Sequence, residues 1–231
     1  MGKRIWIIKW GGLLILTILT LILLGYFLQE ELRITEGVLG VPLDDAWIHF
    51  QFARNLSQGH GFSYNPGEPT PGSTAPLWTI LLAGVSILSS DILRPAIALS
   101  AIFFLLSIWL TFGFTYWISR SYWPAFLAAL GTILVGRFLW AGMAAMETTA
   151  FAALSLAAIW IYSKHGLRLL PALLFALASQ FRPEGHALFA LAIVDSGYQW
   201  WQDQRGFSEG RLNSLILQFL PVVAVYILIA A

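Results

Sequence analysis

Residues 41–78 read VPLDDAWIHFQFARNLSQGHGFSYNPGEPTPGSTAPLW and are far more polar than the sequence on either side of them. They contain the adjacent carboxylates Asp44 and Asp45, two of the four histidines and an Asn-Pro-Gly turn sequence. Such a segment does not belong in hydrocarbon, where unsatisfied polar groups are costly. We therefore expect an outer loop at a membrane surface, with the apolar remainder of the chain as its helical scaffold.

The composition of the whole chain supports this reading. Of 231 residues, 58% are hydrophobic and only 11% are charged, whereas a soluble domain carries about 25% charged residues. The mean hydropathy of +0.74 indicates a polytopic α-helical membrane protein. The absence of cysteine excludes disulfides and Cys-ligated zinc. The basic residues are scattered, so nucleic acid is not an expected partner.

The N-terminus carries Lys3, Arg4 and Lys9, followed by the apolar run GGLLILTILTLILLGYFL at 11–28. A cleaved signal peptide has an apolar region of only about 7–15 residues and a small-x-small cleavage site. Here the run is longer and continues into Gln-Glu-Glu without such a site. The pattern favours an uncleaved signal anchor over 1–28, with the N-terminus in the cytoplasm.

The remaining apolar runs predict an all-α, polytopic integral membrane protein with about seven transmembrane helices. A span needs about 20 apolar residues, and candidates after the anchor are 95–118, 123–140, 148–162, 167–181, 186–200 and 212–231. The chain then reads as a single module, 1–231, made of the anchor, an extracytoplasmic loop with interfacial helices over 29–93, and a helical bundle over 94–231. The sequence stops inside an apolar segment. We therefore expect the chain to be a shortened or split version of a larger protein.

The segment 76–90 is apolar but short, and whether it crosses decides the topology. If it stays on the outer side, Arg120, Lys164 and three later cations become cytoplasmic, as the positive-inside rule requires. If it crosses, those cations lie outside. We predict an interfacial or re-entrant helix with Trp78 at the membrane interface, in a multi-pass protein of the cell (inner) membrane.

Asp44 and Asp45 precede a helical sequence, AWIHFQFARNL. A single Asp there would be read as a helix cap, because Asp is a preferred N-cap residue and anions favour the positive end of the helix dipole. Two in succession indicate a functional site, since the predicted topology places Glu147, Arg182 and Glu184 on the same outer side. Capping and catalysis are compatible roles for one carboxylate.

The run DDAWIHFQFARNLSQGHGFSYNPGE followed by PGSTAPLW resembles the first outer loop of the GT-C superfamily of membrane glycosyltransferases, in the branch that contains mycobacterial terminal arabinofuranosyltransferases and mannosyltransferase-like relatives. Met146-Glu147-Thr148 and Arg182-Pro183-Glu184-Gly185 resemble two later motifs of that family. Together the matches cover about residues 40–186.

The resemblance implies an inverting transfer of a sugar from a polyprenyl-phosphate donor to an extracytoplasmic acceptor glycan, lipid or protein. It implies Asp44 as the base on the acceptor hydroxyl, with Asp45 as the adjacent second acid. We expect Asp44 at the bottom of an outward-opening cavity. The leaving phosphate needs positive charge, for which Arg182 is the first candidate and Arg137 the second.

The remaining candidates have less specific roles. Glu147 could cap a helix, orient substrate or bind a metal, and a structural or substrate-orienting role is favoured. Arg182 and Glu184 could pair with each other. His49 lies one helical turn after Asp45 and could share its site or pack on the helix face, while Arg137 could extend to the interface without a ligand. The spacing matches no metal-ligand motif, and neither a metal nor a cofactor is expected.

The chain departs from the family pattern where Pro71-Gly72-Ser73-Thr74-Ala75 replaces a segment with an acid and an aromatic residue, and where alanines precede Met146. These departures leave a second hypothesis open, a non-catalytic subunit derived from this fold that packs in a larger membrane complex with other subunits. A transporter is disfavoured, because its sites usually place polar groups near the membrane midplane.

Overall fold

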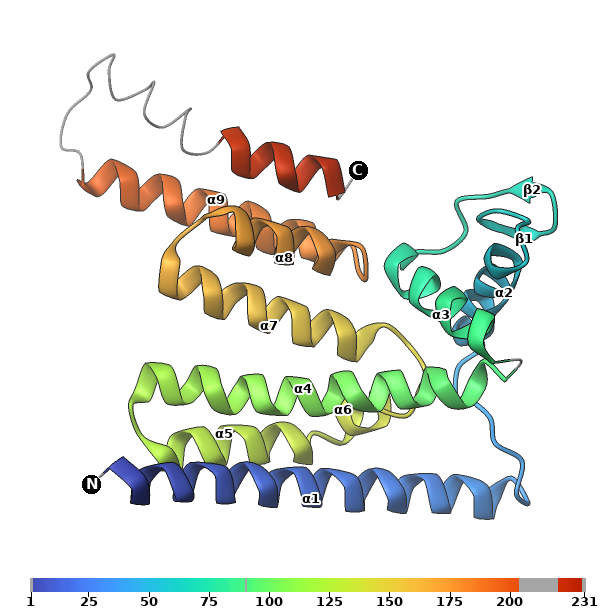
Figure 1. The fold of residues 1–231 in the computed structure, drawn as a ribbon, viewed down its shortest axis with the longest axis horizontal. Helices are drawn as coiled ribbons and strands as arrows, with labels where there is room; N and C mark the ends of the chain where they lie inside the picture. Colours follow the sequence, from blue (N-terminus) through green and yellow to red (C-terminus); the bar gives the residue numbers. More distant parts are fainter. Residues whose placement is uncertain (1, 90, 204–219, 230–231) are drawn as a thin grey trace.

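The computed structural model describes residues 2–89, 91–203 and 220–229 and is all-α apart from one small hairpin (Figure 1). The helices are α1 (Gly2–Ile34), α2 (Asp45–Ser57), α3 (Pro76–Leu88), α4 (Leu93–Ser119), α5 (Tyr122–Leu134), α6 (Gly136–Ala141), α7 (Thr148–His165), α8 (Leu169–Ser179), α9 (Glu184–Asp203) and a last apolar helix, Leu220–Ile229.

The long helices form a bundle with α4 at its centre. Helix α4 contacts α1, α5 and α7, and the series continues from α7 to α8 and from α8 to α9. The side chains between these helices are apolar and fully buried, among them Leu16, Phe104, Ile108 and Ile133. The predicted all-α class is confirmed, and the bundle forms the scaffold on which the polar stretch rests.

The polar stretch folds into a separate unit at one end of the bundle, made of α2, α3 and the hairpin of β1 (Ser63–Asn65) and β2 (Glu68–Pro69) (Figure 1). The hairpin turns at Pro66-Gly67, where Gly67 has a φ of +82° that glycine adopts without strain. The buried Asn55 of α2 donates from Nδ2 to the carbonyls of Ser63 and Tyr64, at 2.9 and 2.7 Å. These bonds fasten the hairpin to α2.

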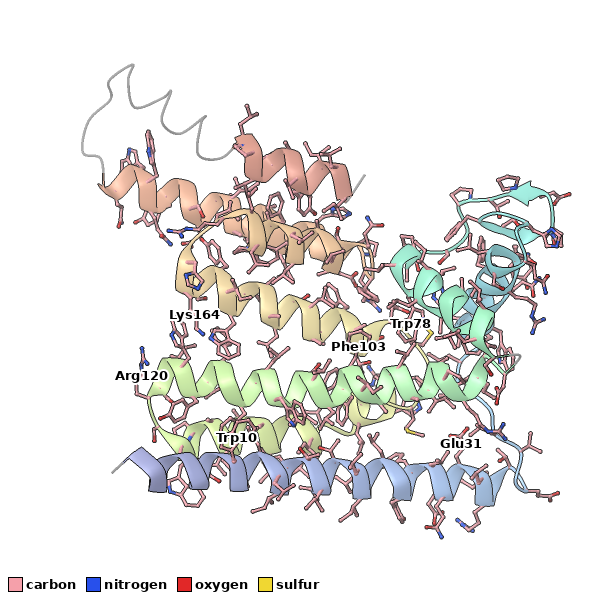
Figure 2. The ribbon with its side chains drawn as sticks, in the orientation of Figure 1. Trp10, Glu31, Trp78, Phe103, Arg120 and Lys164 are labelled. Carbon is pink, nitrogen blue, oxygen red and sulfur yellow. The ribbon has the colours of Figure 1, made fainter. Side chains whose placement is uncertain are left out.

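The two ends of the bundle carry different charges. Arg120 and Lys164 lie at the end where the N-terminus begins, while Glu31 lies at the end where α2 and α3 sit (Figure 2). Helices α4 and α7 run in the same direction, and both end at the basic side. The turns that precede α7 and α9 lie at the opposite end, beside the α2–α3 unit.

Among the described residues, two helices are long and apolar enough to cross a membrane by length and composition, Trp10–Ile34 and Leu93–Ser119. The other expected spans correspond to shorter or less apolar helices, such as the 13 residues of α5 and the 11 of α8. The residues 212–219 of the last expected span lie outside the described part of the chain.

The predicted span 123–140 is wrong as a continuous helix. It divides at Val135, whose ψ of 97° is extended, into α5 and the short α6. The sequence around the break reads Gly131-Thr-Ile-Leu-Val-Gly136, and glycine and β-branched residues have low helix propensity.

The predicted position of Trp78 at a membrane interface is also wrong. Trp78 is fully buried, and its indole Nε1 donates to the carbonyl of Ala145 at 3.3 Å. The backbone N–H of Leu77 donates to the carbonyl of Gln180 at 3.1 Å. Helix α3 therefore uses its first turn to hold the outer unit against the bundle, and the tryptophan is an internal contact.

Candidate functional site

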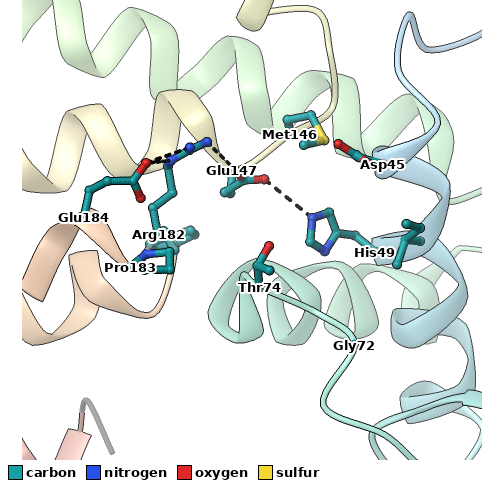
Figure 3. Close-up of a pocket in the computed structure, with 11 residues that line it drawn as sticks. Asp45, His49, Gly72, Thr74, Met146, Glu147, Arg182, Pro183 and Glu184 are labelled. Atoms are coloured by element: carbon teal, nitrogen blue, oxygen red, sulfur yellow. Dashed lines mark hydrogen bonds and ion pairs between the residues drawn. The ribbon is translucent and has the colours of Figure 1, made fainter.

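A pocket of about 550 Å³ lies between the outer unit and the end of the bundle (Figure 3). One wall comes from the start of α2 and the segment before α3, and the other comes from the turns that precede α7 and α9. The lining residues are Asp45, Ile48, His49, Gly72, Thr74, Met146, Glu147, Phe181, Arg182, Pro183 and Glu184. Three segments that are far apart in sequence thus meet at one pocket.

The turn that presents Glu147 is held in place by α4. Ser100 Oγ donates to the carbonyl of Met146 at 3.1 Å, and Thr149 Oγ1 donates back to the carbonyl of Ser100 at 2.9 Å. Ala145 has a φ of +54°, which is unfavourable for a residue with a Cβ. Its carbonyl accepts the indole N–H of Trp78. A strained backbone held at both sides fixes the direction in which Glu147 points.

Arg182 joins two carboxylates. Its Nη1 donates to Glu147 Oε1 at 3.0 Å, and its Nη2 and Nε donate to Glu184 Oε1 at 2.9 and 3.3 Å. The hydrogen bonds that Arg182 donates to Glu184 raise the pKa of Arg182, and the same bonds lower the pKa of Glu184. The expected Arg182–Glu184 pair is therefore present. Since a guanidinium has five N–H donors, two remain for a ligand in the pocket.

His49 is buried and lies on the far side of Glu147 from Arg182. Its Nδ1 is 3.1 Å from Ser73 Oγ, which in turn is 2.9 Å from Thr79 Oγ1. Its Nε2 is 3.6 Å from Glu147 Oε2. Burial lowers the pKa of His49, although the nearby carboxylates of Glu147 and Asp45 oppose that effect. The ring is thus favoured in its neutral form, and Ser73 and Thr79 orient it.

The carboxylate of Glu147 is incompletely paired. Its side chain is only 5% exposed, and Oε2 has no hydrogen-bond partner among the described residues. The 3.6 Å to His49 Nε2 is beyond hydrogen-bond length. Leaving a buried oxygen unpaired costs about 1–3 kcal/mol. Such a cost is typical of functional sites, where an unpaired polar group is available to a partner that arrives later.

The two aspartates have different positions, and the expectation that Asp44 lies at the bottom of the cavity is wrong. Asp44 occupies the N-cap position of α2, where its carboxylate accepts the backbone N–H of Asp45 at 3.1 Å. Asp45, in the first turn of α2, is the aspartate that lines the pocket. Because α2 begins between them, one residue of the pair caps the helix and the next faces the pocket.

Arg137 lies apart from this site. It belongs to α6 and lines a different pocket, together with Phe138 and Trp140. The structure therefore brings together Asp45, His49, Glu147, Arg182 and Glu184, whereas Asp44 and Arg137 are not among the residues that line this pocket. Among the described residues, no group of three or more His, Asp or Glu side chains is arranged to hold a metal ion.

Comparison of the chain with protein-family models, curated proteins and solved structures finds no match.

Sequence reasoning missed the hydroxyls that hold His49. Ser73 lies in the segment 71–75 that departs from the family pattern, and Thr79 lies after the quoted motif, so no motif revealed their place in the site. A signal was nonetheless present. Ser73 and Thr74 come directly before α3, and Thr79 lies in its first turn, so their hydroxyls gather near one helix start.

Gly185 permits the close contact between the turn at Arg182 and the end of α8. A Cβ at this position would lie 2.5 Å from the backbone nitrogen of Ser179 and 2.6 Å from its Cα. We expect Gly185→Ala to lower the free energy of unfolding by about 1–3 kcal/mol, the usual cost of overpacking, because backbone atoms cannot move aside as a side chain can. Thermal unfolding of the purified chain in detergent measures this.

The matched control is Gly197→Ala in the same helix, where no atom of the described residues lies within 4 Å of the added Cβ. That variant is expected to be neutral or up to about 1 kcal/mol more stable, since glycine is unfavourable inside helices. Equal stability of the two variants would contradict the close contact.

Proposed function

We propose that the chain is a membrane glycosyltransferase module that transfers a sugar from a polyprenyl-phosphate donor to an extracytoplasmic acceptor. The observation that carries the proposal is the meeting of Asp45, Glu147 and Arg182, from three distant segments, at one pocket. The same three segments carry the resemblance to GT-C enzymes. The volume of about 550 Å³ lies within the range of small-ligand sites.

The chemistry of an inverting transfer assigns a task to each group. The acceptor oxygen attacks the anomeric carbon, the bond from that carbon to the phosphate oxygen breaks, and the acceptor proton passes to a base. Asp45 is the proposed base, because a carboxylate at the pocket wall can take the proton as it is lost in the transition state. Arg182 is the proposed partner of the leaving phosphate, through its two remaining N–H groups.

Glu147 and His49 are proposed to bind the sugar or acceptor hydroxyls rather than to react. The unpaired Glu147 Oε2 accepts, and the neutral His49 ring is fixed by Ser73. Glu184 keeps the guanidinium of Arg182 in place. These assignments give the three acids of the pocket separate tasks.

A membrane location is supported by the surface of α1. In its most apolar stretch only 22% of the residues are buried inside the protein, and Leu14, Leu21 and Ile22 are 57–61% exposed. The core helix of a soluble protein would have most of such residues covered. Lipid is the solvent in which a long exposed apolar face is favourable.

We propose that the α2–α3 unit faces outward and that the N-terminus is cytoplasmic. The basic end of the bundle, with Arg120 and Lys164, then lies inside, in agreement with the positive-inside rule (Figure 2). In this arrangement α3 stays with the outer unit, and the shorter helices α5 to α9 complete a multi-pass bundle of about seven spans with the last apolar helix.

The topology has a direct test. Because the chain has no cysteine, one cysteine can be introduced at a time. A cysteine at Ser57 should react with a membrane-impermeant thiol reagent in intact cells. One at Ser163 should react only after the membrane is opened. Reaction of both from the same side would contradict the proposed topology.

The activity is tested with membrane vesicles that contain the chain and radiolabelled polyprenyl-phosphate sugars, pentose and hexose forms in parallel. We expect release of free polyprenyl phosphate and label in an acceptor fraction, both absent from vesicles without the chain. If no donor is consumed, and the chain is instead recovered with stoichiometric membrane partners, the subunit hypothesis replaces this one.

A further inference from the structure

A second pocket, of about 630 Å³, opens where the predicted span 123–140 divides. Its lining residues are Val135, Arg137, Phe138, Trp140, Ala141 and Thr148. None of these also lines the pocket of Asp45 and Arg182. The proposed function makes no use of this pocket.

Arg137 is the charged residue of that pocket and has no partner in the part of the chain that the structure describes. It is exposed, and among residues 2–89, 91–203 and 220–229 it makes no ion pair and no hydrogen bond. By contrast, Arg94 and Arg182 pair with carboxylates at 2.7 and 2.9 Å. The hydroxyl of Thr148, on the same pocket wall, likewise donates to no acceptor in that part of the chain. The guanidinium of Arg137 and the hydroxyl of Thr148 therefore lie in the wall of a pocket whose other lining side chains are aliphatic or aromatic.

The surroundings suit an amphiphile. Arg137 lies four residues before the end of α6 at Ala141, about 6 Å along the helix axis at 1.5 Å per residue. This end adjoins the turn that leads to Glu147. Trp140 is 37% exposed, as is typical of residues at the headgroup level. Leu134 and Val135, 64% and 51% exposed, continue the surface on the other side of Arg137 with apolar atoms.

We infer that this pocket binds one anionic phospholipid of the outer leaflet. Its phosphodiester accepts hydrogen bonds from the guanidinium of Arg137 and the hydroxyl of Thr148, and an acyl chain lies along Leu134 and Val135. The charges favour an anionic headgroup, because no carboxylate lines the pocket to balance Arg137 or to bind a choline cation.

The inference rests on the membrane location proposed above and not on sugar transfer. The polyprenyl-phosphate donor is a different lipid. Its phosphate is proposed to bind Arg182 in the pocket that Asp45 and Arg182 line. Because Thr148 follows Glu147 directly, a bound phospholipid would contact the turn that carries Glu147 into the other pocket.

Native mass spectrometry of the detergent-purified full chain tests this binding. The probe is dioleoyl phosphatidylglycerol, with dioleoyl phosphatidylcholine and a polyprenyl phosphate titrated in parallel. We expect one tightly retained phosphatidylglycerol per chain and weaker phosphatidylcholine binding. Arg137→Gln should weaken phosphatidylglycerol binding about 10- to 100-fold, the range for a hydrogen bond to a charged group. Thr148→Val should weaken it less.

Arg120→Gln is the matched control, because it removes an exposed arginine at the opposite end of the bundle and should leave the tight site intact. Arg137→Lys keeps the charge and should retain part of the affinity for phosphatidylglycerol. Such partial binding would show that the loss in Arg137→Gln comes from the missing charge and not from misfolding. Equal affinities for the two phospholipids, or no change in Arg137→Gln, would overturn the inference. Tight binding of polyprenyl phosphate alone would assign the pocket to the donor lipid instead. If the chain binds phosphatidylglycerol tightly but has no transferase activity, the proposed function is refuted and the lipid site is still supported.

Discussion

Asp45→Asn is expected to lower the rate of sugar transfer by about 10²- to 10⁴-fold, the range for loss of a general base. Asparagine has nearly the same size and keeps the hydrogen-bonding oxygen, but it cannot accept the acceptor proton. Asp45 is at the pocket wall and makes no ion pair within 4 Å among the described residues. Stability and expression should therefore change little. Initial rates of polyprenyl-phosphate release in the vesicle assay give the measurement.

Asp44→Asn is the matched control for that experiment. Its carboxylate caps α2, and asparagine is as good a cap as aspartate. Transfer should therefore stay close to the wild-type rate, within a few-fold. If Asp44→Asn instead loses most of its transfer activity while Asp45→Asn stays active, Asp44 is the base and Asp45 is not. Full activity in both variants would exclude a catalytic aspartate in this loop.

Arg182→Gln is the second substitution with a large expected effect. Removing one fixed donor from a group that stabilises developing charge costs about 10²- to 10³-fold in rate, and here the charge develops on the leaving phosphate. The variant should also be less stable, because Glu147, with a 5% exposed side chain, loses its ion-pair partner. Breaking a fully buried pair costs about 3–5 kcal/mol. The cost here should be smaller, since the side chain of Arg182 is 35% exposed.

A double variant separates these two effects. In Glu147→Gln with Arg182→Gln the buried carboxylate is gone and only the exposed Glu184 has lost its partner, so the stability should recover in thermal unfolding. If Arg182 acts on the phosphate, transfer should remain low in the stable double variant. Recovery of both stability and transfer would show that Arg182 serves only to neutralise Glu147.

Much of the architecture could be predicted from the sequence, because the pattern of apolar runs is a local property. Helices α1 and α4 are expected from 18 or more apolar residues in succession. The break at Val135 was missed, since hydropathy does not distinguish a continuous helix from two helices when all the residues are apolar. The burial of Trp78 was missed for a related reason. A tryptophan beside a membrane and a tryptophan inside a protein look alike in sequence, and only the contact with Ala145 separates them.

The candidate site was predictable in its charged members and not in their geometry. Asp45, Glu147, Arg182 and Glu184 stood out as charges in an apolar chain. Which of two adjacent aspartates faces the pocket depends on where α2 begins, and helix boundaries are uncertain by a few residues in sequence analysis. The sequence places the hydroxyls of Ser73 and Thr79 near one helix start, but it does not show the contact of Ser73 with His49, 24 residues away.

The burial of Trp78 also bears on how a substrate reaches the pocket. The α2–α3 unit is joined to α1 through residues 35–44 and rests on the bundle through the first turn of α3. One wall of the pocket belongs to the unit and the other to the bundle. A rotation of the unit about Trp78 would therefore widen or narrow the mouth of the pocket while both walls stay rigid. If the chain transfers sugar as proposed, such a rotation would admit a bulky acceptor and then exclude water during transfer.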